Sequence, residues 1–108
     1  MNQSIASLVQ TLSELLEKSS IKIALAESCT GGLLAAHLTA QAGSSLWFDR
    51  GFVTYSNVSK TESIGVSPSI IEQYGAVSEE VARAMAQGAL NHSAAETSIA
   101  ITGIAGPG

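Results

Sequence analysis

The sequence predicts an α/β fold in which helices alternate with short, buried and largely parallel strands. Three observations support this. The chain opens with a helical apolar pattern, three short runs resemble strands, and capping residues mark helices between them. Hydrophobic residues make up 45% of the 108 residues but aromatic residues only 5%, so we expect a core of Ala, Ile, Leu and Val. A chain of this length buries about two thirds of its unfolded surface, which predicts one domain over residues 1–108.

The first half of the chain predicts two helices and two strands. An amphipathic helix ending near residues 18–20 is indicated by apolar residues at helical spacing, namely Ile5, Leu8, Val9, Leu12, Leu15 and Leu16. Residues 21–28 predict a buried strand that feeds a glycine-containing loop, and residues 33–40 predict a second helix. Residues 51–56 are good strand formers and predict the second strand.

The second half predicts two more helices and a third strand. Ser67 and Pro68 start a short helix that closes at Gly75. Ser78 caps another helix, whose expected buried stripe is Val81, Ala84, Met85, Gly88 and Ala89. Residues 97–102 predict the third strand, and residues 103–108 a glycine-rich loop. Three strands are fewer than the usual sheet of about four to six, and the chain stops where a crossover should continue, so we expect the domain to lack its last strands and helix.

Charge and composition exclude several classes of partner. The net charge is -4, with five Lys and Arg against nine Asp and Glu, so we expect no nucleic-acid partner and no membrane partner. No apolar run approaches the length of a membrane span and no signal sequence is visible, which predicts a cytoplasmic protein. One cysteine and two histidines, His37 and His92, predict neither a disulfide nor a metal site, and no cofactor is implied.

The loop after the first predicted strand is rich in hydroxyl and glycine residues: Ser28, Thr30, Gly31 and Gly32. Open backbone N–H groups at a helix start form a cradle for phosphate, although the lysine and the spacing of a P-loop are absent. Two interpretations stay open. The segment is either part of a nucleotide site or a tight turn with a hydroxyl cap.

A second glycine-rich loop begins at Thr102 and Gly103, after the third predicted strand. Ligands of open α/β sheets bind beyond the carboxyl ends of the strands, so the two loops are expected to face one crevice. The alternative is a disordered tail.

The stretch GSSLWFDRGFVTYSNVSK, residues 43–60, gathers Ser45, Tyr55 and Lys60. A serine with a lysine base is a known catalytic pair, provided that burial lowers the pKa of the lysine. Tyr55 could relay a proton or hold the lysine. Such residues are also common in loops without function, and Cys29 competes as a nucleophile because it lies at a helix start.

Five blocks together resemble the CinA carboxy-terminal domain family, which includes stand-alone bacterial nicotinamide-nucleotide amidohydrolases. The blocks are AESCTGGLLAAHLT at 26–39, the stretch at 43–60, IGV at 64–66, YGAVSEEVA at 74–82 and TGIAGPG at 102–108. The resemblance covers nearly all of the chain from Ile21 onward, in order and at unbroken spacing.

The resemblance implies hydrolysis of the carboxamide of nicotinamide mononucleotide to nicotinate mononucleotide and ammonia, in pyridine-nucleotide recycling. It maps a Ser/Lys dyad onto Ser45 and Lys60, with Tyr55 nearby. Residues implied to hold the nucleotide are Ser28, Thr30, Gly31, Gly32, Thr102 and Gly103. It also implies a three-layer α/β/α sandwich with a mostly parallel mixed sheet, and self-association into a homo-oligomer. The alternative is a non-catalytic nucleotide-binding or accessory module, an inactive paralogue associated with competence.

Overall fold

The computed structural model describes residues 4–104, so residues 105–108 of the predicted glycine loop lie outside the described part. Along the chain the elements are α1 (Ile5–Ser19), β1 (Ile23–Glu27), α2 (Leu33–Thr39), the 3-10 helix η1 (Ser44–Leu46), β2 (Phe48–Val53), α3 (Asn57–Ile64), α4 (Pro68–Tyr74), α5 (Glu79–Asn91) and β3 (Thr97–Ile101).

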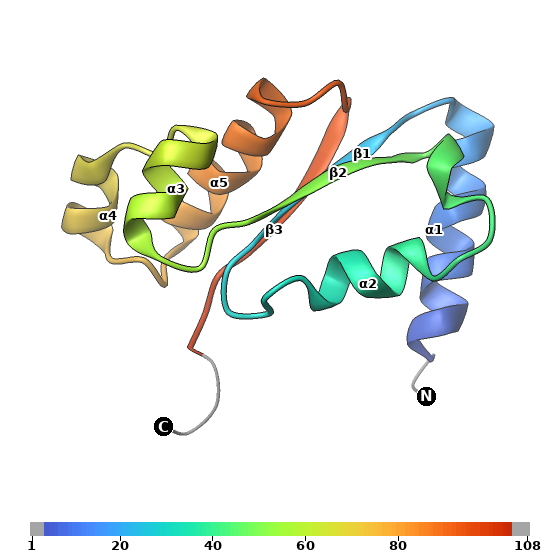
Figure 1. Cartoon of the computed structure of the whole chain (residues 1–108), viewed down its shortest axis with the longest axis horizontal. Helices are drawn as coiled ribbons and strands as arrows, with labels where there is room; N and C mark the ends of the chain where they lie inside the picture. The colour runs from blue at the N-terminus through green and yellow to red at the C-terminus, as the bar shows by residue number, and fades with distance from the viewer. Residues whose placement is uncertain (1–3, 105–108) are drawn as a thin grey trace.

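The described strands form a parallel sheet in the order β2-β1-β3, which confirms the predicted α/β class. The sheet runs between two groups of helices, with α1 and α2 on one face and α3, α4 and α5 on the other (Figure 1). This is the three-layer arrangement implied by the family resemblance. Every residue of the central strand β1 is buried, as expected of a strand that is covered on both faces.

Alternation along β1 assigns its side chains to the two faces. Ala24 and Ala26 belong to the apolar cluster that includes residues of α3, α4 and α5, whereas Ile23 and Leu25 belong to the cluster with α1 and α2. Successive side chains of a strand point to opposite faces. The next residues therefore divide in the same way, with Glu27 facing α2 and Ser28 facing α3.

Helix α5 packs closely against α3 through the predicted stripe. Val81, Met85, Gly88 and Ala89 are buried, which confirms four of the five expected positions, while Ala84 is half-buried. A Cβ added at Gly88 would overlap the carbonyl oxygen of Ile64. Only glycine allows the backbones of α5 and α3 to come this close. Gly88 therefore sets the distance at which α3 packs against α5.

The second strand and the helix after it correct the sequence-based assignment. The strand begins at Phe48 and ends at Val53, three residues earlier than predicted, and residues 57–64 form a helix that was not predicted. The start of the strand was not predicted because Asp49 and Arg50 are charged, and charged residues are uncommon in strands. In the structure Arg50 Nε lies 2.7 Å from Asp49 Oδ2, so the two side chains form an ion pair. The sequence of this helix shows no clear helical spacing of apolar residues, since Lys60 and Ile64 are its only buried residues.

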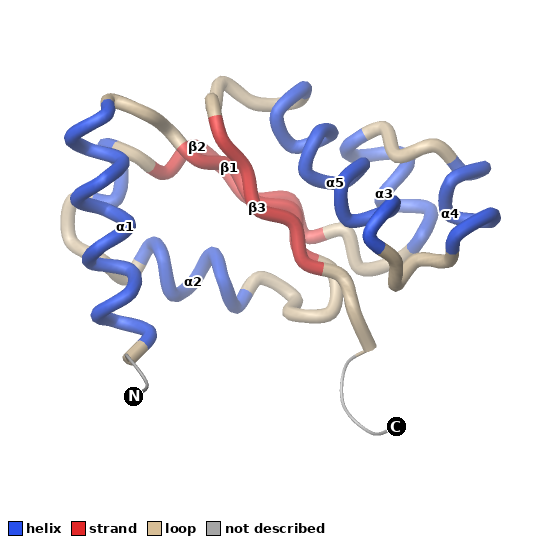
Figure 2. Tube along the Cα trace, turned by 180° about the vertical axis from the view of Figure 1, so that it is seen from behind, coloured by secondary structure: helices blue, strands red, loops and turns tan. Residues whose placement is uncertain are grey.

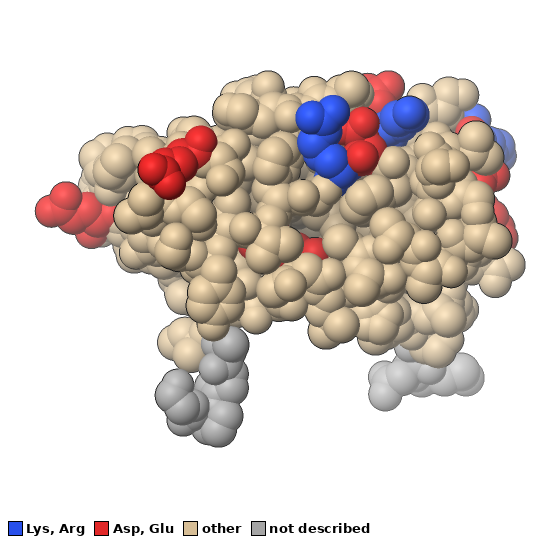
Figure 3. Space-filling model, viewed as in Figure 1, with Lys and Arg blue, Asp and Glu red and all other residues tan. Residues whose placement is uncertain are grey.

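Helix α1 buries less of its apolar surface than its pattern suggested. Val9 and Leu16 are buried, whereas Ile5, Leu8 and Leu15 each remain more than half exposed. Among residues 4–104, no helix is both long enough and apolar enough to cross a membrane. On the face shown in Figure 3, the basic side chains lie next to acidic ones, and most of the visible surface is uncharged.

Candidate active site

The carboxyl ends of the three strands meet at one end of the sheet, where all three loops leave it (Figure 2). The N–H of Thr54, just after β2, donates to the carbonyl of Glu27 at 2.8 Å, and the N–H of Ser28 donates to the carbonyl of Ile101 at 3.0 Å. These bonds extend the parallel pairing by one residue past β1. They hold Ser28 between the ends of the neighbouring strands.

Lys60 reaches this meeting point from α3. The helix starts directly after β2 because the Ser56 side chain accepts a hydrogen bond from the N–H of Ser59. Lys60 is then only 1% exposed, and its Nζ lies 3.2 Å from Ser28 Oγ. The same Nζ donates to the carbonyl oxygens of Thr54 at 3.1 Å and Tyr55 at 3.3 Å.

All three partners accept hydrogen bonds from the amine, since Lys60 Nζ donates to Ser28 Oγ as well as to the two carbonyls, and the Ser28 hydroxyl donates to the carbonyl of Tyr55 at 3.3 Å. Of these partners only the Ser28 hydroxyl carries a hydrogen that it could turn toward the lone pair of a neutral amine. Burial lowers the pKa of Lys60 from its ordinary value of 10.5, and the nearby Cys29 partly opposes this. The arrangement can therefore make Ser28 a nucleophile with Lys60 as its base.

The structure does not bring Ser45 and Lys60 together, so the predicted pairing is corrected. Ser45 lies exposed in η1, before the amino end of β2, whereas Lys60 packs beyond the carboxyl end of that strand. Five steps of about 3.3 Å along β2 separate these ends by roughly 17 Å. Ser28, predicted only to bind the nucleotide, occupies the position beside Lys60 instead.

Tyr55 contacts Lys60 and Ser28 through its main chain. Its carbonyl oxygen accepts hydrogen bonds from Lys60 Nζ and from Ser28 Oγ, each at 3.3 Å, while the residue as a whole is 64% exposed. No hydrogen bond joins the phenol to Lys60 within the described part of the chain. The predicted proximity of Tyr55 and Lys60 is confirmed, but the contact is a backbone one.

The first amides of α2, which follow the predicted phosphate cradle at residues 28–32, bind a side chain of the protein itself. Glu27, only 1% exposed, accepts hydrogen bonds from the N–H groups of Leu34 at 2.9 Å and Ala35 at 2.8 Å. The Thr30 hydroxyl donates to the same carboxylate at 2.7 Å. Gly31 and Gly32 supply the turn through φ values of +61° and +104°. The amides of Leu34 and Ala35 are therefore not free to bind phosphate, whereas nucleotide binding by residues 28–32 stays a prediction.

Glu27 is a residue that sequence reasoning missed, although a carboxylate ending an apolar strand before a glycine turn was a usable signal. Burial alone would raise the pKa of the Glu27 carboxyl. Hydrogen bonds from Thr30, Ala35 and Leu34 outweigh burial and hold the pKa below its ordinary value of 4.5. The charged carboxylate thus fixes the loop that carries Ser28.

We expect Glu27→Gln to lower the free energy of unfolding by about 2 kcal/mol at neutral pH, because a glutamine amide turns hydrogens toward buried N–H groups. Since the folded pKa is depressed, the stabilisation is present above the unfolded pKa and is lost as the pH falls through the folded pKa. Urea unfolding at neutral and acidic pH measures both effects. The exposed Glu72→Gln is the matched control. Equal stability of the two variants at neutral pH would contradict this role for Glu27.

The second glycine loop does lie against the first, as predicted. A Cβ added at Gly103 would come within 3.1 Å of Cys29 Sγ, so the loops after β1 and β3 pack closely. The Thr102 hydroxyl donates to the carbonyl of Ala76 at 2.8 Å and thereby ties the end of β3 to the turn before α5. In this structure the Thr102 side chain supports the fold, and any binding role remains a prediction.

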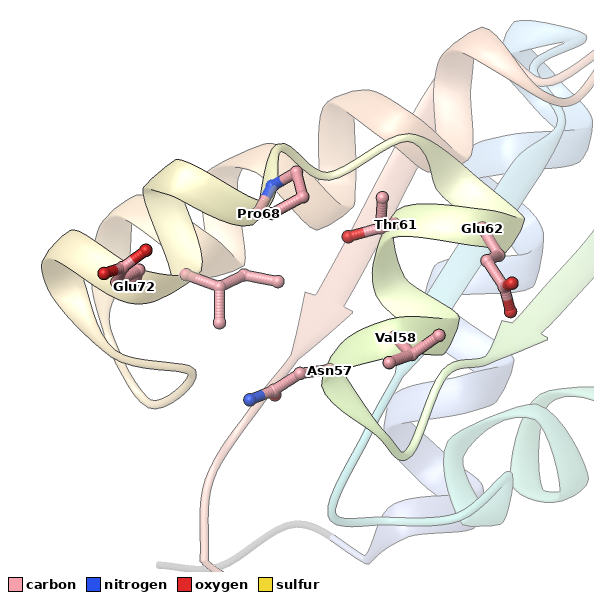
Figure 4. A pocket seen from close by; sticks show the side chains of 7 residues that line it. Asn57, Val58, Thr61, Glu62, Pro68 and Glu72 are labelled. Carbon is pink, nitrogen blue, oxygen red and sulfur yellow. The ribbon is translucent and has the colours of Figure 1, made fainter.

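Two hollows in the surface of the described residues are lined by neither Ser28 nor Lys60. One of about 450 Å³ lies between α3 and α4, where Val58 and Thr61 face Pro68 and Glu72 (Figure 4). Another of about 440 Å³ is lined by Ile101 and Thr102 together with residues at the start of α5. This second hollow adjoins the end of β3, the strand whose last carbonyl holds Ser28. Over residues 4–104 no three His, Cys, Asp or Glu side chains gather where they could hold a metal ion.

Fold and site together define an α/β domain that places a buried serine and lysine at the carboxyl ends of parallel strands. The chain belongs to the CinA C-terminal domain family, whose model matches residues 5–108. It is 59% identical over 85 residues to a nicotinamide-nucleotide amidohydrolase of Enterobacter agglomerans, covering 79% of this chain and 52% of that protein. It is 54% identical over 102 residues to a CinA-like protein of Chlorobium phaeovibrioides, covering 94% of this chain but only 24% of that protein.

Solved structures agree with this assignment. The competence/damage inducible protein of Agrobacterium tumefaciens superposes with a TM-score of 0.94 at 44% identity, covering all of this chain and 66% of that one. A CinA superfamily protein from Escherichia coli also gives a TM-score of 0.94, at 42% identity over 96% of this chain and 60% of that one. The chain thus spans about half of its amidohydrolase relative and about two thirds or less of these solved relatives.

Proposed function

We propose that this chain carries the reactive centre of an amidohydrolase that cleaves the carboxamide of nicotinamide mononucleotide, with Ser28 as the nucleophile and Lys60 as the base. The observation that carries the proposal is the 3.2 Å contact between Lys60 Nζ and Ser28 Oγ in a buried site. The name of the Enterobacter agglomerans relative supports the reaction class and the nucleotide. The geometry of this chain supports the choice of Ser28 as nucleophile and Lys60 as base.

The first half of the reaction forms an acyl-enzyme. Ser28 Oγ bonds to the amide carbon while its proton passes to Lys60 Nζ, and the carbonyl oxygen takes up the negative charge. The tetrahedral intermediate then collapses and the carbon–nitrogen bond breaks. Lys60 returns the proton to the leaving nitrogen, which departs as ammonia.

The second half regenerates the enzyme. A water molecule gives a proton to Lys60 Nζ and attacks the ester carbon, and the bond to Ser28 Oγ breaks. Lys60 then protonates Ser28 Oγ, and the product acid gives its remaining proton to solvent and leaves as a carboxylate. The main-chain carbonyls of Thr54 and Tyr55 keep Lys60 in place through both halves. They hold the amine without adding a negative charge that would raise its pKa.

Ammonia release from nicotinamide mononucleotide tests the proposal. We expect turnover by the chain, or by a chimera in which this chain replaces the matching region of the Enterobacter agglomerans relative. The control is the same chimera with Ser28→Ala. A chimera that folds and binds the nucleotide in calorimetry, but releases no ammonia, would contradict the proposal and favour a non-catalytic nucleotide-binding module.

A further inference from the structure

The hollow of about 450 Å³ between α3 and α4 is separate from the reactive centre. Its apolar lining comes from Val58 on α3 and from Pro68 and Ile71 on α4. Val58 is 64% exposed, whereas Ile71 is buried. Exposed apolar surface that is gathered in a hollow, and not scattered singly, marks a site of interaction with another molecule.

The charges around this hollow are negative. Glu62 and Glu72 line it, and both are exposed. In the view of Figure 4 these carboxylates lie at its opposite ends, with Val58 and Pro68 between them. No Lys or Arg is among the described lining residues, and on the face in Figure 3 the end of the molecule formed by α3 and α4 shows acidic but no basic side chains. An occupant therefore needs an apolar centre with positive charge on either side.

The hollow lies on the side of α3 away from the reactive amine. Successive residues of an α-helix are about 100° apart around its axis. Val58 and Glu62 are each two residues from Lys60, so they lie on nearly the opposite side of the helix from it. A molecule bound here would contact the helix that holds the base and leave Ser28 and Lys60 uncovered.

We propose that the hollow between α3 and α4 docks an amphipathic helix of a partner protein. The apolar side of that helix contacts Val58 and Ile71, and its Lys or Arg side chains pair with Glu62 and Glu72. A groove with apolar walls accepts the apolar stripe of a helix in this way, and basic residues at the edges of the stripe reach the rim. The docking site is independent of the reaction proposed above.

A second copy of this chain fits the hollow poorly. Of its five Lys and Arg, Lys60 is buried, and Arg50 and Arg83 pair with Asp49 and Glu79. The remaining two lysines lie at or just after the end of α1, a helix that also exposes glutamates. Two copies also repel each other, since each carries a net charge of -4. A basic partner gains from the same charge.

Calorimetric titration with two synthetic peptides tests the inference. The probe is the capped peptide KLAKLLAKLAK, which places leucines at helical spacing with lysines on either side. The control peptide ELAELLAELAE keeps the leucines and reverses the charge. We expect the first peptide to bind the wild-type protein and the second to give no binding heat.

The double variant Glu62→Gln and Glu72→Gln should bind the basic peptide at least about fivefold more weakly, because two exposed ion pairs are lost. The matched control is the double variant Glu14→Gln and Glu80→Gln, which removes the same charge from exposed positions elsewhere. Its affinity should stay within about twofold of wild type.

Nitrogen-15 spectra locate the peptide without relying on a variant. The amide signals of Val58, Thr61 and Ile71 should shift when the basic peptide is added. Those of Leu8 and Leu15, which are exposed apolar residues of α1, should not. This comparison separates the hollow from the other exposed apolar surface of the chain.

Absence of binding by the basic peptide would overturn the inference, and so would equal affinities of the two double variants or shifts confined to α1. Equally tight binding of the acidic peptide would show apolar contact alone and would contradict the charge pairing. A dimer in sedimentation that Val58→Arg returns to a monomer would place a second copy in the hollow and overturn the choice of occupant.

Discussion

Ser28→Ala is expected to lower kcat/KM for ammonia release from nicotinamide mononucleotide by at least about 10³-fold, because it removes the attacking oxygen. The change should be in kcat more than in KM, since the hydroxyl forms its decisive bond only during the reaction. Steady-state kinetics on the active chain or chimera measures both constants.

Ser45→Ala is the matched control, since Ser45 lies exposed beyond the opposite end of β2 and contacts neither Ser28 nor Lys60. We expect its kcat/KM to stay within about twofold of wild type. Loss of activity in Ser45→Ala with full activity in Ser28→Ala would restore the pairing predicted from sequence. It would also remove the basis of the proposed mechanism.

Lys60→Met is expected to lower kcat by about 10² to 10⁴-fold, the usual contribution of a general base. Methionine keeps an unbranched apolar side chain at this buried position. Lys60→Arg should not restore activity, because a guanidinium stays protonated and cannot accept the Ser28 proton. Near-normal turnover by either variant would contradict the role of Lys60 as base.

The pH dependence provides an independent test of the same residue. Activity should rise with pH through a pKa below 10.5, since burial depresses the pKa of Lys60 and only the neutral amine is a base. Between the folded pKa and 10.5 the unfolded state binds more protons than the folded state, so stability should also rise with pH. Lys60→Met should remove that part of the slope in thermal unfolding measured across this window. An unchanged slope would show that the amine is charged in the folded protein.

The layers of the fold were predictable because local signals agreed with one another. The buried run at 21–28, the caps at Ser67 and Ser78, and the apolar stripe of α5 all predicted elements that the structure contains. Helix α3 was not predicted because one of its two buried residues is a lysine. A helix is recognised from regularly spaced apolar residues, and a lysine does not count among them. Its two caps, Ser56 and Gly65, were the available signal.

The site was predictable in its composition but not in its pairing. The sequence indicated a serine, a lysine and two glycine loops at the ends of strands, and the structure brings Ser28, Lys60 and Gly103 to that end of the sheet. Ser45 was paired with Lys60 because the two are close in the chain. Strand β2 separates them, while the parallel pairing of β1 and β2 brings Ser28, 32 residues away in sequence, to within 3.2 Å of the lysine.

The central claim is that Lys60 makes Ser28 the reactive serine of this chain. Labelling with an alkyl fluorophosphonate, followed by peptide mass spectrometry, measures this directly, because the reagent bonds to serines activated by a base. The account predicts a label on Ser28 in wild type and little or none in Lys60→Met. A label on Ser45 with Ser28 unmodified, or labelling of Ser28 at the same rate in Lys60→Met, would contradict it.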